Sequence, residues 1–148
     1  MSKINQILSK FNLRIEKISK NQNLYDVLNY LFKKLEINVL LDVGANEGQF
    51  AKKVRSYGYS EKIISFEPLH NVYERLISNT KKDKNWIHKN LAIGDFNGET
   101  YINVSNYSLS SSILQMSDLH LEAKKNSEFI SKHKIQIEKI DTFISKND

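Results

Sequence analysis

The chain has 148 residues, 40% hydrophobic and 26% charged, with a formal charge of +5, which is typical of one globular domain. The absence of cysteine excludes disulfides and thiolate metal sites and is in keeping with a cytoplasmic location, which we expect. No apolar run approaches the roughly 18 residues of a membrane-spanning helix. The lysines are scattered, so we expect no nucleic-acid partner.

We expect residues 1–36 to form a helical lead to a main domain at 37–148. Residues 4–18 place apolar side chains at helical spacing and most basic side chains on the other side, which predicts an amphipathic helix. Such a helix either packs on its own domain, which we favour, or binds a membrane surface or a partner. The apolar residues of this segment are Ile4, Ile7, Leu8, Phe11, Ile15 and Ile18.

A second helix is predicted to begin after Asn23, which has the character of an N-cap, with Asp26 three residues further on. The apolar run at 38–43 then predicts a strand buried on both faces, which is typical of a parallel sheet. The stripe that we expect the second helix to bury consists of Leu24, Val27, Leu28, Leu31 and Leu35.

Helices and strands are predicted to alternate through residue 91. Strands are expected at 62–67 and 86–91, with helices at about 48–57 and 71–81. This β-α-β-α-β order predicts an α/β fold that contains the first strands of a doubly wound parallel sheet. The residues expected to face inward from the two helices are Phe50, Val54 and Tyr57, and Val72, Leu76 and Ile77.

The pattern changes after Leu91. Asn97-Gly98 lies between two short apolar segments, at 92–93 and 101–104, which predicts a β-hairpin. A helix is predicted at about 116–131 and a strand at 135–140. Asp141 is expected to cap a last turn of helix.

The chemistry is concentrated in the segment Asp42-Val-Gly-Ala-Asn-Glu-Gly48, which follows the first strand. This loop is expected at the carboxyl end of the sheet, where open α/β sheets bind ligands. Glycine adopts positive φ without strain and asparagine is the next most tolerant residue, so Asn46 can stand where a glycine often stands. The helix that begins near Gly48 directs N–H groups and partial positive charge toward the ligand. Glu67, at the end of the next strand, can accept the hydroxyls of a ribose.

Two cofactor classes use this arrangement. The dinucleotide fingerprint requires glycine at the first, third and sixth positions of its hexad; counted from Gly44, Asn46 and Gln49 fail. The S-adenosylmethionine pattern, an acid followed by three alternate glycines, fits Asp42, Gly44 and Gly48 with Asn46 as the single departure. The residues therefore favour S-adenosylmethionine over a dinucleotide.

Further motifs in the same order resemble the FkbM family of methyltransferases: Ser65-Phe-Glu-Pro68, Asn90-Leu-Ala-Ile-Gly-Asp95, the serines at 110–112, and 135–141. The resemblance covers about residues 24–145. It implies a Rossmann-like class I methyltransferase fold and S-adenosylmethionine-dependent transfer of a methyl group to a hydroxyl of a sugar or secondary metabolite. The residues that it assigns to the cofactor are Asp42, Gly44, Ala45, Asn46 and Gly48 at the methionine end, Glu67 with Pro68 at the ribose, and Asn90, Ala92 and Asp95 by the adenine.

The residues do not identify the catalytic base or the acceptor, which we expect to be a small molecule or a glycan. His70 lies either at the rim of the site or, as we favour, on the surface. Asp95 either approaches the cofactor or belongs to a turn, and the serines at 110–112 either line an acceptor pocket or cap a helix. The histidine spacings predict no metal site.

The family's pattern continues with further strands that this chain lacks, so we expect only part of the fold. The alternative to an enzyme is then a truncated, non-catalytic remnant or binding module. The strand at 38–43 should lack one neighbour, and an open apolar edge promotes association. Either the strand at 135–140 covers this edge, or another chain does, or the protein is poorly behaved.

Overall fold

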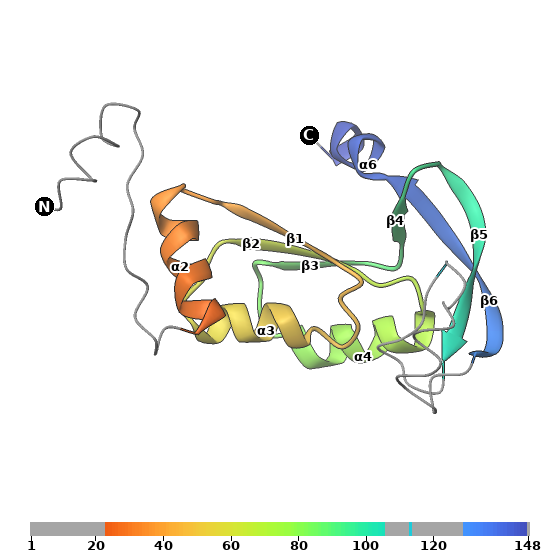
Figure 1. Ribbon diagram of the computed structural model, residues 1–148, viewed down its shortest axis with the longest axis horizontal. Coiled ribbons are helices and arrows are strands. Elements are labelled where there is room, and N and C mark those ends of the chain that lie inside the picture. The colour runs from red at the N-terminus through yellow and green to blue at the C-terminus, as the bar shows by residue number, and fades with distance from the viewer. Residues whose placement is uncertain (1–22, 106–112, 114–128, 148) are drawn as a thin grey trace, which may run out of the picture.

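The structure, a computed structural model, describes residues 23–105, 113 and 129–147. It confirms a mixed α/β fold, with a parallel sheet and a mixed sheet (Figure 1). Several features that the sequence predicts lie outside the described residues. They are the lead helix at 4–18, the serines at 110–112, and most of the helix predicted at 116–131, which includes His120. None of the helices within the described ranges combines the length and the apolar character needed to cross a bilayer.

The first sheet is three-stranded and parallel, in the order β1-β2-β3, as the sequence predicts. The register places Asp42 opposite Ser65, and Ile63 opposite Trp86. The helices α2, α3 and α4 all lie on the same side of this sheet (Figure 1). The elements are α2 (Leu24–Lys34), β1 (Val39–Val43), α3 (Gln49–Ser56), β2 (Lys62–Phe66), α4 (His70–Thr80) and β3 (Trp86–Lys89).

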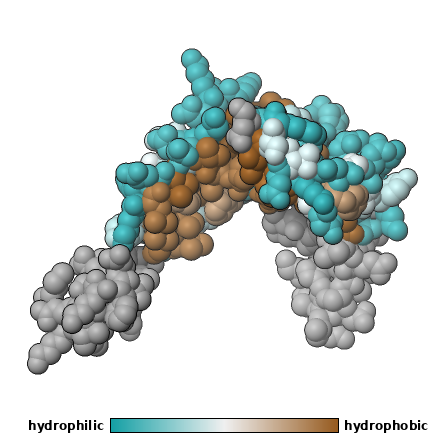
Figure 2. Space-filling view, turned by 90° about the horizontal axis from the view of Figure 1, so that it is seen from above, coloured by the Kyte–Doolittle hydropathy of each residue, from teal (hydrophilic) through white to brown (hydrophobic). Residues whose placement is uncertain are grey.

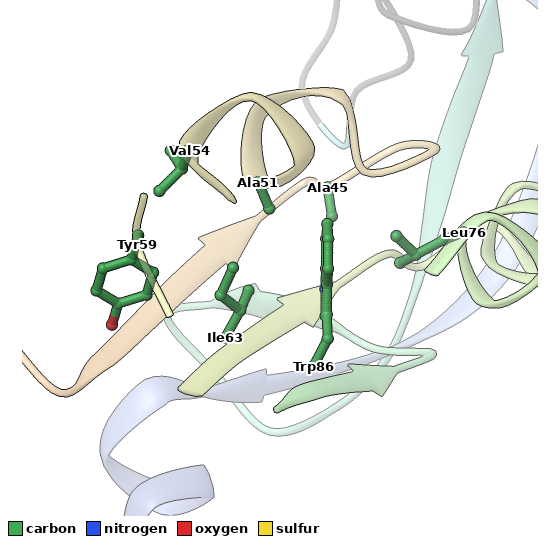
Figure 3. Close-up of a cluster of buried hydrophobic side chains, with 7 residues drawn as sticks. All are labelled: Ala45, Ala51, Val54, Tyr59, Ile63, Leu76 and Trp86. Carbon is green, nitrogen blue, oxygen red and sulfur yellow. The ribbon is translucent and has the colours of Figure 1, made fainter. Parts of the chain in front are cut away.

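The core of this half lies between the sheet and the three helices. Trp86 extends from β3 between the β1–α3 loop and Leu76 of α4, while α3 presents Ala51 and Val54 to the sheet (Figure 3). Burial of each of the larger apolar side chains contributes about 1.5–3 kcal/mol to the free energy of folding. The core therefore fixes the end of β1 and the start of α3 relative to β2. The buried cluster consists of Ala45, Ala51, Val54, Tyr59, Ile63, Leu76 and Trp86.

The prediction that β1 is buried on both faces is wrong. Val39 is 40% exposed and Val43 is 55% exposed. The reason is that the described helices α2, α3 and α4 cover one face of the sheet, whereas Val39 and Val43 belong to the other. Among the described residues β1 pairs only with β2, and β6 (Phe129–Lys139) belongs to a different sheet. The expectation of an open edge beside β1 is thus confirmed for this part of the chain, and the strand at 135–140 does not cover it.

Asn23 caps α2 as predicted. Its side-chain oxygen accepts from the backbone N–H groups of Tyr25 and Asp26, and the Asp26 carboxylate accepts from the Asn23 N–H. The predicted buried stripe, however, is wrong, because α2 turns its aromatic residues inward. Tyr25 stacks on Tyr57 at 5.4 Å, and Phe32 packs on Tyr59 at 5.0 Å. No residue of α2 is fully buried, and the leucines most exposed are Leu24 (63%), Leu31 (38%) and Leu35 (62%).

The inward faces predicted for the next two helices are partly correct. Val54, Val72 and Leu76 are buried as expected. Phe50 and Ile77 are 39% and 36% exposed, so these two assignments are wrong. Both lie at the margin of their helix's apolar side, and Ala51, not Phe50, occupies the close contact between α3 and the sheet.

The second sheet contains β4 (Ala92–Gly94), β5 (Gly98–Ser105) and β6 (Phe129–Lys139), in the order β4-β6-β5. The predicted hairpin is wrong, because β6 lies between β4 and β5. Asn97 instead holds the end of β6: its side-chain oxygen accepts from the Lys139 N–H at 2.8 Å, and its amide group donates to Thr142 at 3.1 Å. Because Asn97 forms its hydrogen bonds at the end of β6, residues 97–98 do not form a hairpin turn between β4 and β5.

The strand predicted at 135–140 is confirmed but begins earlier, so the helix predicted to reach about 131 is wrong at 129–131. The last helix, α6 (Ile140–Asn147), includes Asp141 in its first turn and not as its cap. Phe143 of α6 packs edge-on against Phe66 of β2 at 4.9 Å, which joins α6 to the open face of the first sheet.

Candidate functional site

The loop at residues 44–48 joins the carboxyl end of β1 to α3. Its backbone has positive φ at Gly44 (+73°), Asn46 (+49°) and Gly48 (+84°). The prediction that Asn46 takes a conformation usually reserved for glycine is therefore confirmed. Three left-handed residues in five turn the chain sharply, and all five backbone N–H groups of the loop donate to acceptors within the protein.

Backbone contacts fasten this loop to the end of β2. The N–H groups of Gly44 and Ala45 both donate to the Phe66 carbonyl, at 3.0 and 2.9 Å. The Ala45 side chain is buried in the core, so Ala45 can offer only its backbone to a ligand.

Glu67 connects the two loops that follow β1 and β2. One carboxylate oxygen accepts from the Asn46 N–H at 2.9 Å and the other from the Leu69 N–H at 3.0 Å. The residue is only 5% exposed. A carboxylate has about four acceptor positions, so two remain after these contacts. Glu67 thus holds the loop in shape, and its predicted contact with a ribose remains a prediction.

A chain of polar contacts crosses the sheet below the loop. The Trp86 indole N–H donates to the Ser65 hydroxyl at 2.9 Å, and that hydroxyl donates to the Asp42 carboxylate at 3.0 Å. Ser65 is completely buried and Asp42 is 7% exposed. Sequence reasoning missed Ser65 and Trp86 as supports of the site. The available signal was a serine within an otherwise apolar strand, since a buried hydroxyl needs a partner.

Two carboxyl groups with raised pKa values lie at this end of the sheet. Burial raises the pKa of Asp42 above its ordinary 3.8, against the hydrogen bond from Ser65. Burial also raises the pKa of Glu67 above 4.5, and the charge of Asp42 adds to the rise, while the two N–H contacts and Arg75 oppose it. Arg75 itself forms an ion pair with Glu47 at 2.7 Å. The loop therefore carries buried negative charge that a cationic group would stabilise.

This electrostatic cost predicts that Asp42→Asn stabilises the ligand-free protein at neutral pH. A raised carboxyl pKa contributes stability that is fully present below the unfolded-state pKa and is lost as the pH rises through the folded-state pKa. Asparagine still accepts the Ser65 hydrogen bond and cannot ionise. Urea unfolding from about pH 7 to about pH 4.5 should give a variant whose advantage shrinks as the pH falls. A difference that does not vary with pH would show that burial of this charge is not the cause.

The two glycines of the motif have different surroundings. A Cβ built on Gly44 would meet nothing within 4 Å, whereas one on Gly48 would lie 2.9 Å from the Leu76 side chain and 3.3 Å from Trp86. Gly48 is buried, and its N–H donates to the Ala45 carbonyl at 2.9 Å. Gly44 is therefore the glycine that leaves open space for a ligand, while Gly48 allows α3 to pack closely.

Asn90 and Pro68 lie together beside this loop. The Asn90 amide donates to the carbonyls of Glu67 and Pro68, at 2.8 and 3.0 Å, so it joins the end of β3 to the loop after β2. Both residues line a cavity of about 230 Å³ that extends to the exposed ion pair between Glu99 and Lys134. The cavity therefore extends from the loop after β2 to the second sheet.

The structure does not bring Ala92 and Asp95 to the loop. Ala92 is 5% exposed and packs in a second core cluster with Leu69 and Ile102. Asp95 is exposed in the turn after β4, as the turn interpretation predicts. The change of direction between β3 and β4 carries the 92–95 segment into the second sheet.

We assign the role of catalytic base to none of the described histidines. The His70 side chain is 74% exposed, which agrees with the favoured surface interpretation, and lies 3.5 Å from Glu74. His70 and His133 both line the 230 Å³ cavity. His88 lies against the Thr80 hydroxyl at 2.5 Å, and burial lowers its pKa. Within the described ranges no three potential ligands gather as a metal centre would require.

No protein-family model and no curated protein matches this chain.

Proposed function

We propose that residues 42–48 bind the methionine end of S-adenosylmethionine and that the domain is a partial Rossmann-like methyltransferase fold of the FkbM type. The observation that carries this proposal is the left-handed loop after β1, with open space above Gly44 and a buried carboxylate on either side of it. Asp42 suits the ammonium group of an amino acid, and the partial positive charge at the amino end of α3 suits its carboxylate.

The charge of the site supports S-adenosylmethionine over a dinucleotide. Asp42 and Glu67 are buried and have raised pKa values, so a positively charged ligand restores their preference for the ionised form. S-adenosylmethionine carries an ammonium and a sulfonium group, whereas a dinucleotide would place a pyrophosphate beside two carboxylates. The dinucleotide alternative therefore conflicts with both the missing glycines and the charge.

The adenosine half of the ligand would lie along the carboxyl end of β2 and β3. Glu67 retains two acceptor positions for ribose hydroxyls, and the cavity lined by Pro68 and Asn90 is adjacent to them. Its volume of about 230 Å³ suits one ring system. When bound, the cofactor supplies a methyl group on sulfur. The protein's task is to hold an acceptor hydroxyl in line with that bond and to exclude water.

The proposal is tested by isothermal titration of the full chain with S-adenosylmethionine, S-adenosylhomocysteine and, as a control, NAD. We expect the two adenosyl ligands to bind in a 1:1 ratio and NAD not to bind. Binding of NAD alone, or of none of the three by a cooperatively folded protein, would overturn the proposal. Binding without methyl transfer to any hydroxylated acceptor would support the alternative of a non-catalytic binding module.

Gly44→Ala is expected to weaken S-adenosylmethionine binding at least about tenfold, or about 1.4 kcal/mol. The added methyl group would project into the open space that the ligand needs. The strain at φ +73° costs about 1–2 kcal/mol of stability, which leaves a folded protein to titrate. An affinity equal to that of the wild type, measured by the same titration, would place the ligand elsewhere.

A further inference from the structure

A cavity of about 410 Å³ is lined by α3, by the end of α4 with the turn that follows it, and by Trp86 of β3. Its lining is mostly polar or charged, unlike the surface over α2 and β1, where hydrophobic residues are prominent in the space-filling view (Figure 2). The loop at 44–48 contributes no residue to this lining. The cavity is therefore distinct from the candidate cofactor site.

The lining of this cavity carries a net positive charge. Lys52, Lys81 and Lys82 are exposed, and none of them forms an ion pair or a side-chain hydrogen bond with a described residue. Asp83 is the one acidic residue among the described residues of the lining, and Arg55 neutralises it, with its Nε 2.7 Å from the carboxylate. The other guanidinium N–H groups of Arg55 donate to backbone carbonyls. Three lysine charges are thus left for a ligand.

The end of α4 does not account for these charges. The last carbonyl groups of a helix carry about half a negative charge, which a nearby cation stabilises. Lys81 is the C-cap of α4 and Lys82 follows it, so these two residues already exceed that charge. Lys52 precedes the last turn of α3. Like charges around one cavity repel each other, and a bound anion would relieve this repulsion.

We propose that this cavity binds an organic phosphate, that is, a phosphate dianion joined to a ring. Lysine is a common phosphate ligand, and the hydroxyl of Ser78 and the amide of Asn79 add hydrogen-bond donors to the lining. The Trp86 indole N–H already donates to Ser65, so Trp86 offers the ligand its apolar ring surface. A volume of about 410 Å³ is in the range of small-molecule sites.

The fluorescence of Trp86 tests the proposal, because Trp86 is the only tryptophan of the chain and lines the cavity. The full chain is titrated with phenyl phosphate, and with inorganic phosphate to measure what the ring contributes. We expect a saturable change in emission, with tighter binding of phenyl phosphate. Raising the salt concentration should weaken binding, because dissolved ions screen exposed charges. In ¹⁵N spectra, phenyl phosphate should shift the amides of residues 78–82 most.

The variant Lys81→Gln/Lys82→Gln should bind phenyl phosphate at least about tenfold more weakly, because each contact between a lysine and an anion near the surface contributes a few-fold in affinity. The matched control is Lys33→Gln/Lys34→Gln. It removes the same charge from adjacent exposed lysines at the end of α2, which do not line this cavity, so it should bind as the wild type does.

Three results would overturn the proposal. Equal losses of affinity in the two variants would show that the net charge of the chain, not this cavity, attracts the anion. Equal affinity for the two phosphates would identify an adventitious anion only. Neither an emission change nor amide shifts at 78–82 in the folded wild type would show that the cavity does not bind a phosphate.

Discussion

Gly48→Ala is expected to lower the free energy of unfolding by about 2–5 kcal/mol, the sum of about 1–2 for a left-handed L-residue and about 1–3 for overpacking. The cause is local, since the backbone at Gly48 has φ +84° and the new methyl group would lie 2.9 Å from Leu76 and 3.3 Å from Trp86. Neither neighbour can retreat easily, because both belong to the buried core. Urea unfolding followed by circular dichroism measures the change.

Gly44→Ala is the matched control for this variant. It carries the same left-handed strain at φ +73°, but its Cβ meets no atom within 4 Å, so it should lose only about 1–2 kcal/mol. The difference between the two variants isolates the packing of α3 against α4 and β3. Equal losses would contradict the close packing of Gly48 against Leu76 and Trp86.

Glu67→Ala is expected to destabilise the fold by about 2–4 kcal/mol, even in the absence of a ligand. The substitution leaves the buried N–H groups of Asn46 and Leu69 without their acceptors, at about 1–3 kcal/mol each. Relief of the buried charge, whose pKa is raised, offsets part of this loss. Thermal unfolding compares the variant with the wild type without ligand.

Glu67→Gln separates the two roles of this side chain. It keeps the shape and one carbonyl oxygen, so its loss of stability should be smaller than that of Glu67→Ala. If Glu67 also accepts the ribose hydroxyls, both variants should bind S-adenosylmethionine about 10- to 100-fold more weakly, because charge-assisted hydrogen bonds are worth about 1.5–3 kcal/mol. A stable Glu67→Ala protein would show that this carboxylate does not fasten the loop.

Hydrophobic periodicity was sufficient to place the elements of the first sheet, but not to state what covers them. The runs at 38–43 and 62–67 became parallel neighbours as predicted. Periodicity identifies an apolar side without saying whether another element lies against it, so Val43 was wrongly assigned to the interior. For α2 the sequence analysis predicted burial of the leucine stripe, whereas Tyr25 and Phe32 turn inward because they pack against Tyr57 and Tyr59.

The second sheet was harder to predict because its pairing joins distant segments. Asn97-Gly98 has the composition of a hairpin turn, yet the backbone groups that it satisfies lie at the end of β6. Local turn chemistry contains no information about a strand that enters between its two neighbours.

Much of the candidate site was accessible from sequence because backbone conformation limits residue choice. Gly44, Asn46 and Gly48 all have the positive φ that their residue types allow. What the sequence could not distinguish is why each is there: Gly44 faces open space, whereas Gly48 faces the core. The support from Ser65 and Trp86 depends on the register of neighbouring strands, which becomes known only from the fold.

The central claim is that the loop after β1 is the binding site for S-adenosylmethionine, and amide chemical-shift mapping of the ¹⁵N-labelled chain tests it most directly. On addition of S-adenosylmethionine, we expect the largest shifts at the backbone amides of Gly44, Asn46 and Glu47. The amides of Gly58 and Ser60, which line a separate cavity before β2 at the amino end of the sheet, should be unaffected. Shifts confined to Gly58 and Ser60, or no shifts at all in a folded protein, would contradict the account.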